Sequence, residues 1–275
     1  QAKQITDDEG WLHLGALVKM SVAAEDPAVV RNCPVIAQSL LLAASPQIRN
    51  MATLGGNVLQ RTRCTYFRDV SWAACNKRSP GSGCAAMDGV NRSHAVLGGS
   101  EACIATYHGD FAQALVALEA TVELVSPRGT RTIPFEHLHR LPAATPHIEN
   151  DLYAGEMITK FSVPKRAWMK RSLYLKVRDR QSYEFALSSV AVALDLRKKS
   201  VVNARLALGG LATKPWRARE AERVLEGKTF SEAVATKAAE AAFAGAQGKA
   251  HNTFKIDLGR RAVVRALMQA AAMEV

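Results

Sequence analysis

The sequence predicts an α+β protein of two domains, and three observations lead to this prediction. The length of 275 residues allows one large domain or two ordinary ones. Hydrophobic residues make up 48% of the chain and charged residues 22%, which is typical of a globular protein and excludes a disordered one. Short runs of alternating hydrophobicity occur in both halves, and the last quarter has an alanine-rich helical pattern.

The first domain, residues 1–165, is expected to combine short strands with helices. A helix is predicted from Asp26 and Pro27 onward, and another over 111–118 with Asp110 as its cap. Alternating or β-branched runs predict strands at 11–18, 94–97, 103–106, 121–125, 131–134 and 157–163. Residues 60–93 have no such pattern, and the segment is longer than the ~12–15 residues usual for a structureless loop. We therefore expect an insertion loop at about 60–104 that is organised by a metal or by function.

The second domain, residues 166–275, is expected to be a small antiparallel sheet backed by helices. Three runs with short turns between them, 173–178, 188–196 and 202–208, predict an antiparallel meander. From residue 218 onward the pattern is helical, with breaks at Gly227, at 245–248 and near Thr253. No run of about 18 apolar residues occurs, so no membrane span is predicted.

The excess positive charge is concentrated in two segments. The chain has 36 basic and 25 acidic residues, a difference of +11. Residues 49–92 contribute seven basic and two acidic residues, or +5, and residues 160–180 contribute eight and one, or +7. The remainder is therefore close to neutral. Nucleic acid, a phosphate-bearing cofactor, an anionic metal cluster or an acidic partner surface could each offset such charge.

The five cysteines divide into one and four. Cys33 lies in an apolar stretch and suits a buried thiol. The other four lie in the polar loop with the spacing Cys64-x10-Cys75-x8-Cys84-x18-Cys103. Structural zinc sites usually bring cysteines in pairs two to four residues apart. The wide spacing therefore favours a [4Fe–4S] cluster, while zinc and free cysteines stay open as alternatives.

Two further motifs point to an anionic ligand. The stretch Thr53-Leu-Gly-Gly-Asn57 has two glycines, Gly55 and Gly56, whose backbone amides could approach a pyrophosphate, although an ordinary glycine turn has the same pattern. Cations alternate from Lys176 to Arg180. They could line a cleft between the domains, or they could belong to a solvated edge strand.

Taken together, these stretches resemble the flavin-binding subunits of the molybdenum hydroxylases, the family of xanthine dehydrogenase and aldehyde oxidoreductase. The resemblance is carried by residues 45–57 (SPQIRNMATLGGN), by 155–158 (GEMI) and by the segment around Lys176. The cysteine insertion resembles one branch, the three-subunit bacterial aldehyde oxidoreductases, whose medium subunit carries FAD and a [4Fe–4S] cluster. The implied fold is a PCMH-type FAD-binding domain followed by a domain like the C-terminal domain of CO dehydrogenase flavoproteins.

The resemblance implies a role for individual residues. Thr53, Gly55, Gly56 and Asn57 would contact the FAD phosphates, and Asp110 the adenosine side. Ile158 and Lys176 would lie near the flavin ring. The cluster ligands would be Cys64, Cys75, Cys84 and Cys103. The family's second glycine-rich FAD loop, which precedes these motifs, has no match here, so we expect the N-terminal part of that domain to be absent from the numbered chain.

The resemblance also implies the function. This chain would be the electron-transfer subunit of an aldehyde-oxidising enzyme, with no catalytic residue for the substrate. A large subunit would hold the molybdenum cofactor, a small subunit two [2Fe–2S] clusters, and an external acceptor would reoxidise FAD. A soluble protein of the periplasm or cytoplasm is expected, with the periplasm favoured.

Two other functions stay open at this point. A basic nucleic-acid-binding protein with a structural zinc site would explain the charge and the cysteines, but aromatics are only 6% of the chain and few lie among the cations. An assembly subunit without FAD would explain the unmatched N-terminal loop.

Overall fold

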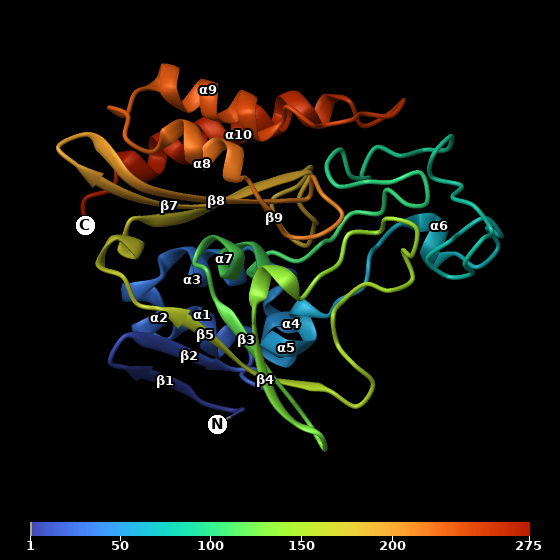
Figure 1. The fold of residues 1–275 in the computed structure, drawn as a ribbon, viewed down its shortest axis with the longest axis horizontal. Coiled ribbons are helices and arrows are strands. Elements are labelled where there is room, and N and C mark those ends of the chain that lie inside the picture. The colour runs from blue at the N-terminus through green and yellow to red at the C-terminus, as the bar shows by residue number, and fades with distance from the viewer. Residues whose placement is uncertain (1) are drawn as a thin grey trace.

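A five-stranded antiparallel sheet forms the base of the molecule. The computed structural model describes residues 2–275, and Figure 1 shows the sheet at the lower left. Its strands, in the order β1-β2-β5-β3-β4, are Ile5–Asp8, Trp11–Gly15, Met157–Pro164, Thr121–Ser126 and Gly129–Pro134. Strand β5 comes late in the chain yet pairs with both β2 and β3, so it joins the two ends of the first domain.

Short helices cover one side of this sheet. Three of them begin with a proline at the first helical position, where a missing N–H costs nothing. Side chains of Asp26, Ser45 and Thr53 cap the helices that follow them. The helices are α1 (Met20–Glu25), α2 (Pro27–Asn32), α3 (Pro34–Leu41), α4 (Pro46–Met51), α5 (Leu54–Val58) and α7 (Phe111–Ala117), with the 3₁₀ turn η1 (Phe135–His137).

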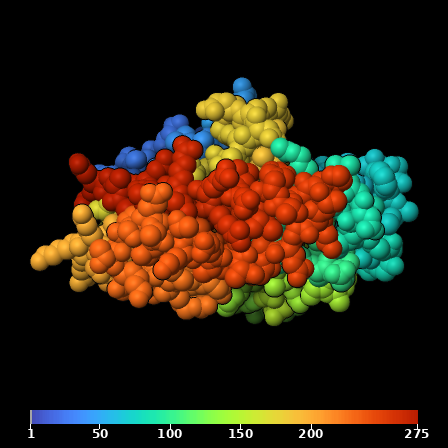
Figure 2. Space-filling view, turned by 90° about the horizontal axis from the view of Figure 1, so that it is seen from above, coloured from blue at the N-terminus to red at the C-terminus, as the bar shows by residue number. Residues whose placement is uncertain are grey.

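The insertion loop leaves the body of the first domain between α5 and α7. Its one described helix is the single turn α6 (Thr65–Arg68). The expected strands at 94–97 and 103–106 are wrong, because the described backbone there makes only isolated bridges, such as Leu97 with Ala212. The loop has a small core of its own that includes Tyr66, Ala86 and Ile104. Seen from above, it gathers at one end of the molecule beside the C-terminal helices (Figure 2).

The second domain is the predicted meander with helices on one face. The 3₁₀ turn η2 (Ala167–Lys170) leads into four antiparallel strands in the order β6-β7-β8-β9. The strands are Ser172–Val177, Ser188–Arg197, Ser200–Gly209 and Trp216–Arg217. The helices are α8 (Arg219–Leu225), α9 (Glu232–Ala242) and α10 (Phe254–Ala271). No helix within residues 2–275 is long and apolar enough to cross a membrane.

The two faces of the second sheet differ in side-chain size, and this difference builds the domain interface. Val190, Val192 and Leu194 of β7 point into the core under α8, α9 and α10. The alternating residues Ala191 and Ala193 point into the core of the first domain. Small side chains let α3 and α7 pack closely against β6, β7 and β8. The molecule is therefore a stack in which α3 and α7 lie between the two sheets (Figure 1).

Candidate functional site

The glycine motif forms the first turn of α5. Thr53 occupies the N-cap, and its hydroxyl oxygen accepts a hydrogen bond of 3.2 Å from the amide of Gly56. The amide of Asn57 donates to the carbonyl of Thr53 at 2.9 Å. These bonds follow from the sequence, because threonine is a favoured N-cap residue and its oxygen reaches the amide three positions later.

The two glycines of this motif serve different purposes. The amides of Leu54 and Gly55 donate to the carbonyls of Val18 and Ala16, at 3.0 and 2.8 Å, so they do not face a ligand. A Cβ at Gly55 would lie 3.1 Å from the Cβ and the carbonyl oxygen of Ala16. Gly55 is therefore required for close packing of α5 on the loop after β2. Gly56 is exposed and leaves the helix surface open.

A cavity of about 440 Å³ lies beside α5, between the two domains. From the first domain it is lined by residues that include Met20, Ile48, Gly56 and Asn57. The Oδ1 atom of Asn57 is buried and has no hydrogen-bond partner among residues 2–275. A buried acceptor without a partner is costly, which indicates that a donor outside the described chain completes it.

The loop that follows β6 closes this cavity from the second domain. Arg180, Tyr183, Glu184 and Phe185 line it, and Arg63 from the insertion loop joins them. The guanidinium of Arg180 pairs with Glu184 at 3.4 Å. Two arginines against one carboxylate leave the lining positive, and the aromatic rings offer flat apolar surfaces. Such a lining suits a ligand with both a negative charge and a planar ring.

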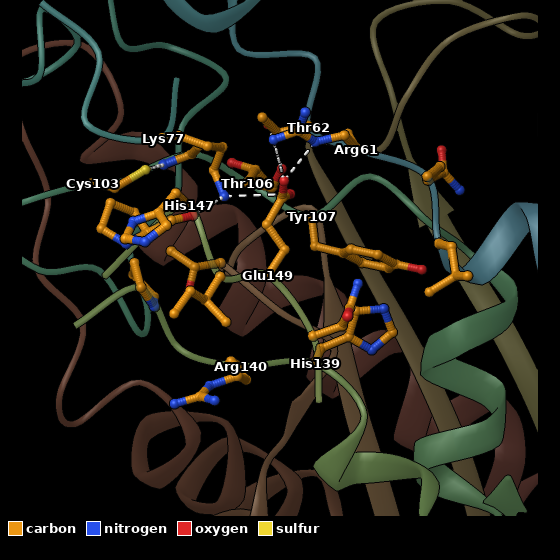
Figure 3. A pocket seen from close by; sticks show the side chains of 18 of the residues that line it. Arg61, Thr62, Lys77, Cys103, Thr106, Tyr107, His139, Arg140, His147 and Glu149 are labelled. Atoms are coloured by element: carbon orange, nitrogen blue, oxygen red, sulfur yellow. Dashed lines mark hydrogen bonds and ion pairs between the residues drawn. The ribbon is translucent and has the colours of Figure 1, made fainter. Parts of the chain in front are cut away.

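A second cavity, of about 520 Å³, lies on the other side of Gln60, which lines both. The Glu149 carboxylate projects into it and pairs with Arg61 at 2.5 Å and with Lys77 at 3.3 Å (Figure 3). Tyr107 and His139 lie at the opposite wall, where each donates a hydrogen bond to the carbonyl of Val58, at 3.0 and 2.8 Å. Both donors thus hold the last turn of α5 between the two cavities.

Asp110 and Lys176 form a buried ion pair behind these cavities. The Lys176 ammonium donates to the Asp110 carboxylate at 2.8 Å and to the carbonyl of Leu42 at 3.0 Å. The Tyr174 hydroxyl donates to the same carboxylate at 2.7 Å. Burial raises the pKa of Asp110, and the ammonium opposes that shift. Asp110 occupies the expected N-cap position of α7, but its side chain makes no capping hydrogen bond because it bonds Tyr174 and Lys176 instead.

Of the seven residues expected to bind FAD, the structure brings two onto the interdomain cavity, Gly56 and Asn57. Thr53 lies beside them as the helix cap. Asp110 and Lys176 line neither cavity, and Ile158 is buried in the core on β5 opposite Leu124. The roles of these seven residues toward FAD stay predictions.

The four loop cysteines meet at one small cavity. Cys64, Cys75, Cys84 and Cys103 all line it, together with apolar and aromatic side chains such as Phe67 and Ala86. All five thiols are free, and Cys33 lies apart in the main core. Within residues 2–275, no three His, Cys, Asp or Glu side chains converge closely enough to hold one metal ion. A four-iron cluster binds each thiolate through a different iron, so it does not require such close convergence.

Several residues of the two cavities were missed at the sequence level. Tyr183 and Phe185 follow the alternating cations closely, and that proximity was the available signal. Glu149 and His139 come from an irregular segment between η1 and β5, and no pattern marks them.

Both parts of the chain match known protein families. Residues 1–166 match the family described as "FAD binding domain in molybdopterin dehydrogenase", and residues 173–270 match "CO dehydrogenase flavoprotein C-terminal domain". Among solved structures, carbon monoxide dehydrogenase from Hydrogenophaga pseudoflava is similar over 98% of this chain and 78% of its own, with a TM-score of 0.73 and 23% identity. Quinoline 2-oxidoreductase from Pseudomonas putida 86 gives a TM-score of 0.70, also at 23% identity, over 98% of this chain and 77% of its own. These two likenesses concern the fold.

Curated relatives are similar over most of the sequence. The aldehyde oxidoreductase FAD-binding subunit PaoB of Escherichia coli (strain K12) is 45% identical over 96% of this chain and 80% of its own length. The nicotine 6-hydroxylase medium subunit of Paenarthrobacter nicotinovorans is 28% identical over 84% and 63%. The glyceraldehyde dehydrogenase medium chain of Sulfolobus acidocaldarius is 26% identical over 80% and 60%. The chain therefore spans four fifths of the first relative and less than two thirds of the other two.

Proposed function

Because the chain belongs to the FAD-binding medium subunits of the molybdenum hydroxylases, we propose that it is the electron-transfer subunit of an aldehyde-oxidising complex. The family match covers the first 166 residues, and the relatives described above include two subunits named for aldehyde oxidation, at 45% and 26% identity. The observation that supports the proposal most directly is the interdomain cavity. It combines the exposed turn of α5 with two arginines and two aromatic rings, which suit a dinucleotide with a flat ring.

FAD is proposed to lie along the cavities that flank α5. Their volumes, about 440 and 520 Å³, fall within the ~300–1,000 Å³ usual for ligand sites. When bound, FAD supplies the electron-accepting and electron-donating chemistry. This chain would bind and orient it. Arg63 and Arg180 would offset the charge of the diphosphate. The buried Asn57 oxygen can only accept, so it would bond an N–H or O–H of the cofactor, and the expected contact of Asn57 with the phosphates would use its side-chain nitrogen.

The remaining assignments toward FAD are proposals of the same kind. Thr53, Gly55 and Gly56 are assigned to the phosphates, Asp110 to the adenosine side, and Ile158 and Lys176 to the flavin ring. For Gly55 the role is indirect, since its amide is already bonded to Ala16. For Asp110 and Lys176 the role is to fix the domain interface behind the site, since they bond each other.

We further propose that Cys64, Cys75, Cys84 and Cys103 hold a [4Fe–4S] cluster. The thiols suit it because all four line one cavity whose other lining residues are mostly apolar or aromatic, and the surrounding segment has a surplus of basic residues. Zinc suits the site less well, because the described thiols do not converge on one point. The cluster would brace a loop that otherwise has little regular structure, and it would also be available for electron transfer.

The rest of the complex is inferred from the relatives. A large subunit with the molybdenum cofactor would oxidise the aldehyde, and a small subunit with two [2Fe–2S] clusters would deliver electrons to FAD in this chain. An external acceptor would then take them. The periplasm stays the expected compartment, which cell fractionation tests. Family membership leaves the nucleic-acid-binding alternative without support.

The optical spectrum of the purified complex, with flavin and iron assays, tests this function. We expect flavin bands over broad iron–sulfur absorbance, and reduction of both by an aldehyde. A colourless protein with one zinc ion would contradict the proposal. A cluster spectrum without flavin would instead favour an assembly subunit.

A further inference from the structure

One of the four loop thiols has a histidine as its neighbour. The Nε2 atom of His94 lies 3.1 Å from Sγ of Cys64, although thirty residues separate the two along the chain. Both side chains are buried, with His94 only 3% exposed. Among residues 2–275, His94 is the one side chain that hydrogen-bonds a sulfur of the four loop cysteines. The sulfur of Cys103 instead accepts a hydrogen bond from the backbone amide of Ala105.

The direction of this hydrogen bond follows from the chemistry of the two atoms. A cysteine that ligates iron is a thiolate, so its sulfur can only accept. Nε2 of His94 must therefore carry the hydrogen, and Nδ1 of a neutral ring is then a bare acceptor. Nδ1 of His94 is buried and has no hydrogen-bond partner in the described chain.

The C-terminal domain fixes the position of His94. The ammonium of Lys255, in the first turn of α10, donates to the carbonyls of His94 and Ser93, at 2.9 and 3.2 Å. The side-chain nitrogen Nδ2 of Asn252 donates to the carbonyls of His94 and Ala95, at 3.3 and 3.2 Å. Lys255 and Asn252 are both fully buried. These bonds hold the histidine backbone from a domain that supplies no cysteine.

We propose that His94 is a positioning residue that donates a hydrogen bond to the Cys64 ligand and thereby raises the reduction potential of the [4Fe–4S] cluster. The inference rests on the cluster proposed above. The reduced cluster carries one more negative charge, partly on its sulfurs, so a donor to a ligand sulfur stabilises the reduced form more than the oxidised one. Lys255 and Asn252 would keep the donor in place.

The experiment compares three variants of the assembled complex. His94→Leu removes the donor, and His94→Gln keeps an N–H at the end of a side chain of similar reach. His251→Leu is the matched control, because His251 lies in the same segment as Asn252 but is exposed. Iron and flavin are assayed first, and the cluster midpoint potential is then measured by redox titration followed by electron paramagnetic resonance.

The donor-free variant should keep its iron and become harder to reduce. At a fixed potential near the midpoint, we expect its ratio of reduced to oxidised cluster to fall about tenfold, which is ~59 mV for a one-electron couple. His94→Gln should lie much closer to the wild type, and His251→Leu should match it. An unchanged midpoint in His94→Leu with full iron would overturn the inference, as would equal shifts in the Leu and Gln variants. A wild-type complex whose iron is fully accounted for by the two [2Fe–2S] clusters of the small subunit would overturn the cluster proposal itself.

A second measurement covers the case in which His94→Leu loses its iron. Wild-type complex grown with ¹⁵N-histidine is reduced, and nitrogen couplings to the cluster spin are recorded by pulsed paramagnetic resonance. A weak coupling that disappears in His94→Gln supports the inference. No coupling in the wild type overturns it.

Discussion

The Lys176 ammonium lies 2.8 Å from the Asp110 carboxylate, and this pair joins β6 of the second domain to the start of α7 in the first. Both side chains are at most 5% exposed. Removing one partner from a buried pair leaves the other charge uncompensated. We therefore expect Lys176→Met to lower the free energy of unfolding by about 3–5 kcal/mol in a urea titration. The double variant with Asp110→Asn should cost less than the sum of the single ones.

An exposed pair provides the comparison for this prediction. Arg92 and Asp179 pair at 2.8 Å, with both side chains about half exposed. Arg92→Gln should therefore cost less than about 1 kcal/mol. If Lys176→Met costs no more than Arg92→Gln, the buried pair does not hold the domains together as argued. The flavin content of folded Lys176→Met tests its proposed indirect effect on the flavin site through the domain interface.

The two glycines of α5 should respond differently to alanine. Gly55→Ala places a Cβ 3.1 Å from Ala16, so we expect a loss of about 1–3 kcal/mol in stability. Gly56→Ala meets only the Thr53 hydroxyl, at 3.2 Å, and should leave stability within about 1 kcal/mol. Its methyl group would face the proposed phosphate position, so flavin content should drop. Full flavin in folded Gly56→Ala would argue against phosphate binding at this turn.

The arginines of the interdomain cavity should act through charge. Arg63→Gln and Arg180→Gln should each weaken FAD binding by about fivefold at low salt, because an exposed pair contributes up to about 1 kcal/mol. The difference should shrink as salt screens the charges. Fluorescence titration of flavin-depleted protein measures both effects. Arg261→Gln on the exposed side of α10 is the control, and an equal effect there would show that only net charge matters.

Segments of the fold could be predicted from the sequence where burial imposes a clear apolar pattern, and were missed where it does not. Strands β7 and β8 were predictable because apolar residues dominate long runs between clear turns. The helix expected from Pro27 is instead two helices, since Pro34 starts α3 and ends the first at Asn32. Strand β1 was missed because Ile5–Asp8 has only one apolar side chain.

Some residues of the candidate site could likewise be predicted from the sequence, and others could not. The four cysteines were predicted as one group because thiols in a polar loop have no core to fill, and they do line one cavity. His94 and Lys255 could not be found that way. Their bonds join segments that lie far apart along the chain, and a single histidine or lysine leaves no periodic signal.

The cysteine assignment predicts a difference in iron content between two substitutions. Cys75→Ser should lower iron by about four atoms per complex, as loss of a four-iron cluster requires. Cys33→Ser should leave iron unchanged, because Cys33 is 1% exposed in the main core and burial raises the pKa of its thiol to about 12. Iron assay with flavin as internal standard checks both. Unchanged iron in Cys75→Ser would remove that residue from the ligand set.

Two histidines whose rings are largely shielded from solvent should make the fold sensitive to acid. His139 is buried, and His108 is half-buried with its Nδ1 atom out of contact with solvent. Desolvation lowers the pKa of His139 to about 4 and that of His108 to about 3, against about 6.5 in the unfolded chain. Between these pKa values each imidazole is therefore protonated in the unfolded state and neutral in the folded state. Their contribution to stability is complete above pH 6.5 and is lost as the pH falls toward 4 and then 3. Each histidine should add about 1.4 kcal/mol per pH unit to the slope in that range.

Substitution of one histidine separates this effect from the titration of carboxylates. His139→Gln keeps an N–H for the Val58 carbonyl, which Nε2 reaches at 2.8 Å, but it cannot take up a proton. We expect urea titrations at pH 7, 6 and 5 to show that the free energy of unfolding of His139→Gln falls less steeply with pH than that of the wild type. Below pH 6 the difference in slope should correspond to about one proton fewer taken up on unfolding. His137→Gln is the control, because that side chain is 65% exposed and should leave the slope unchanged. A wild-type slope in His139→Gln would mean that His139 is protonated in the folded protein, and the hydrogen bond to Val58 would then come from an imidazolium.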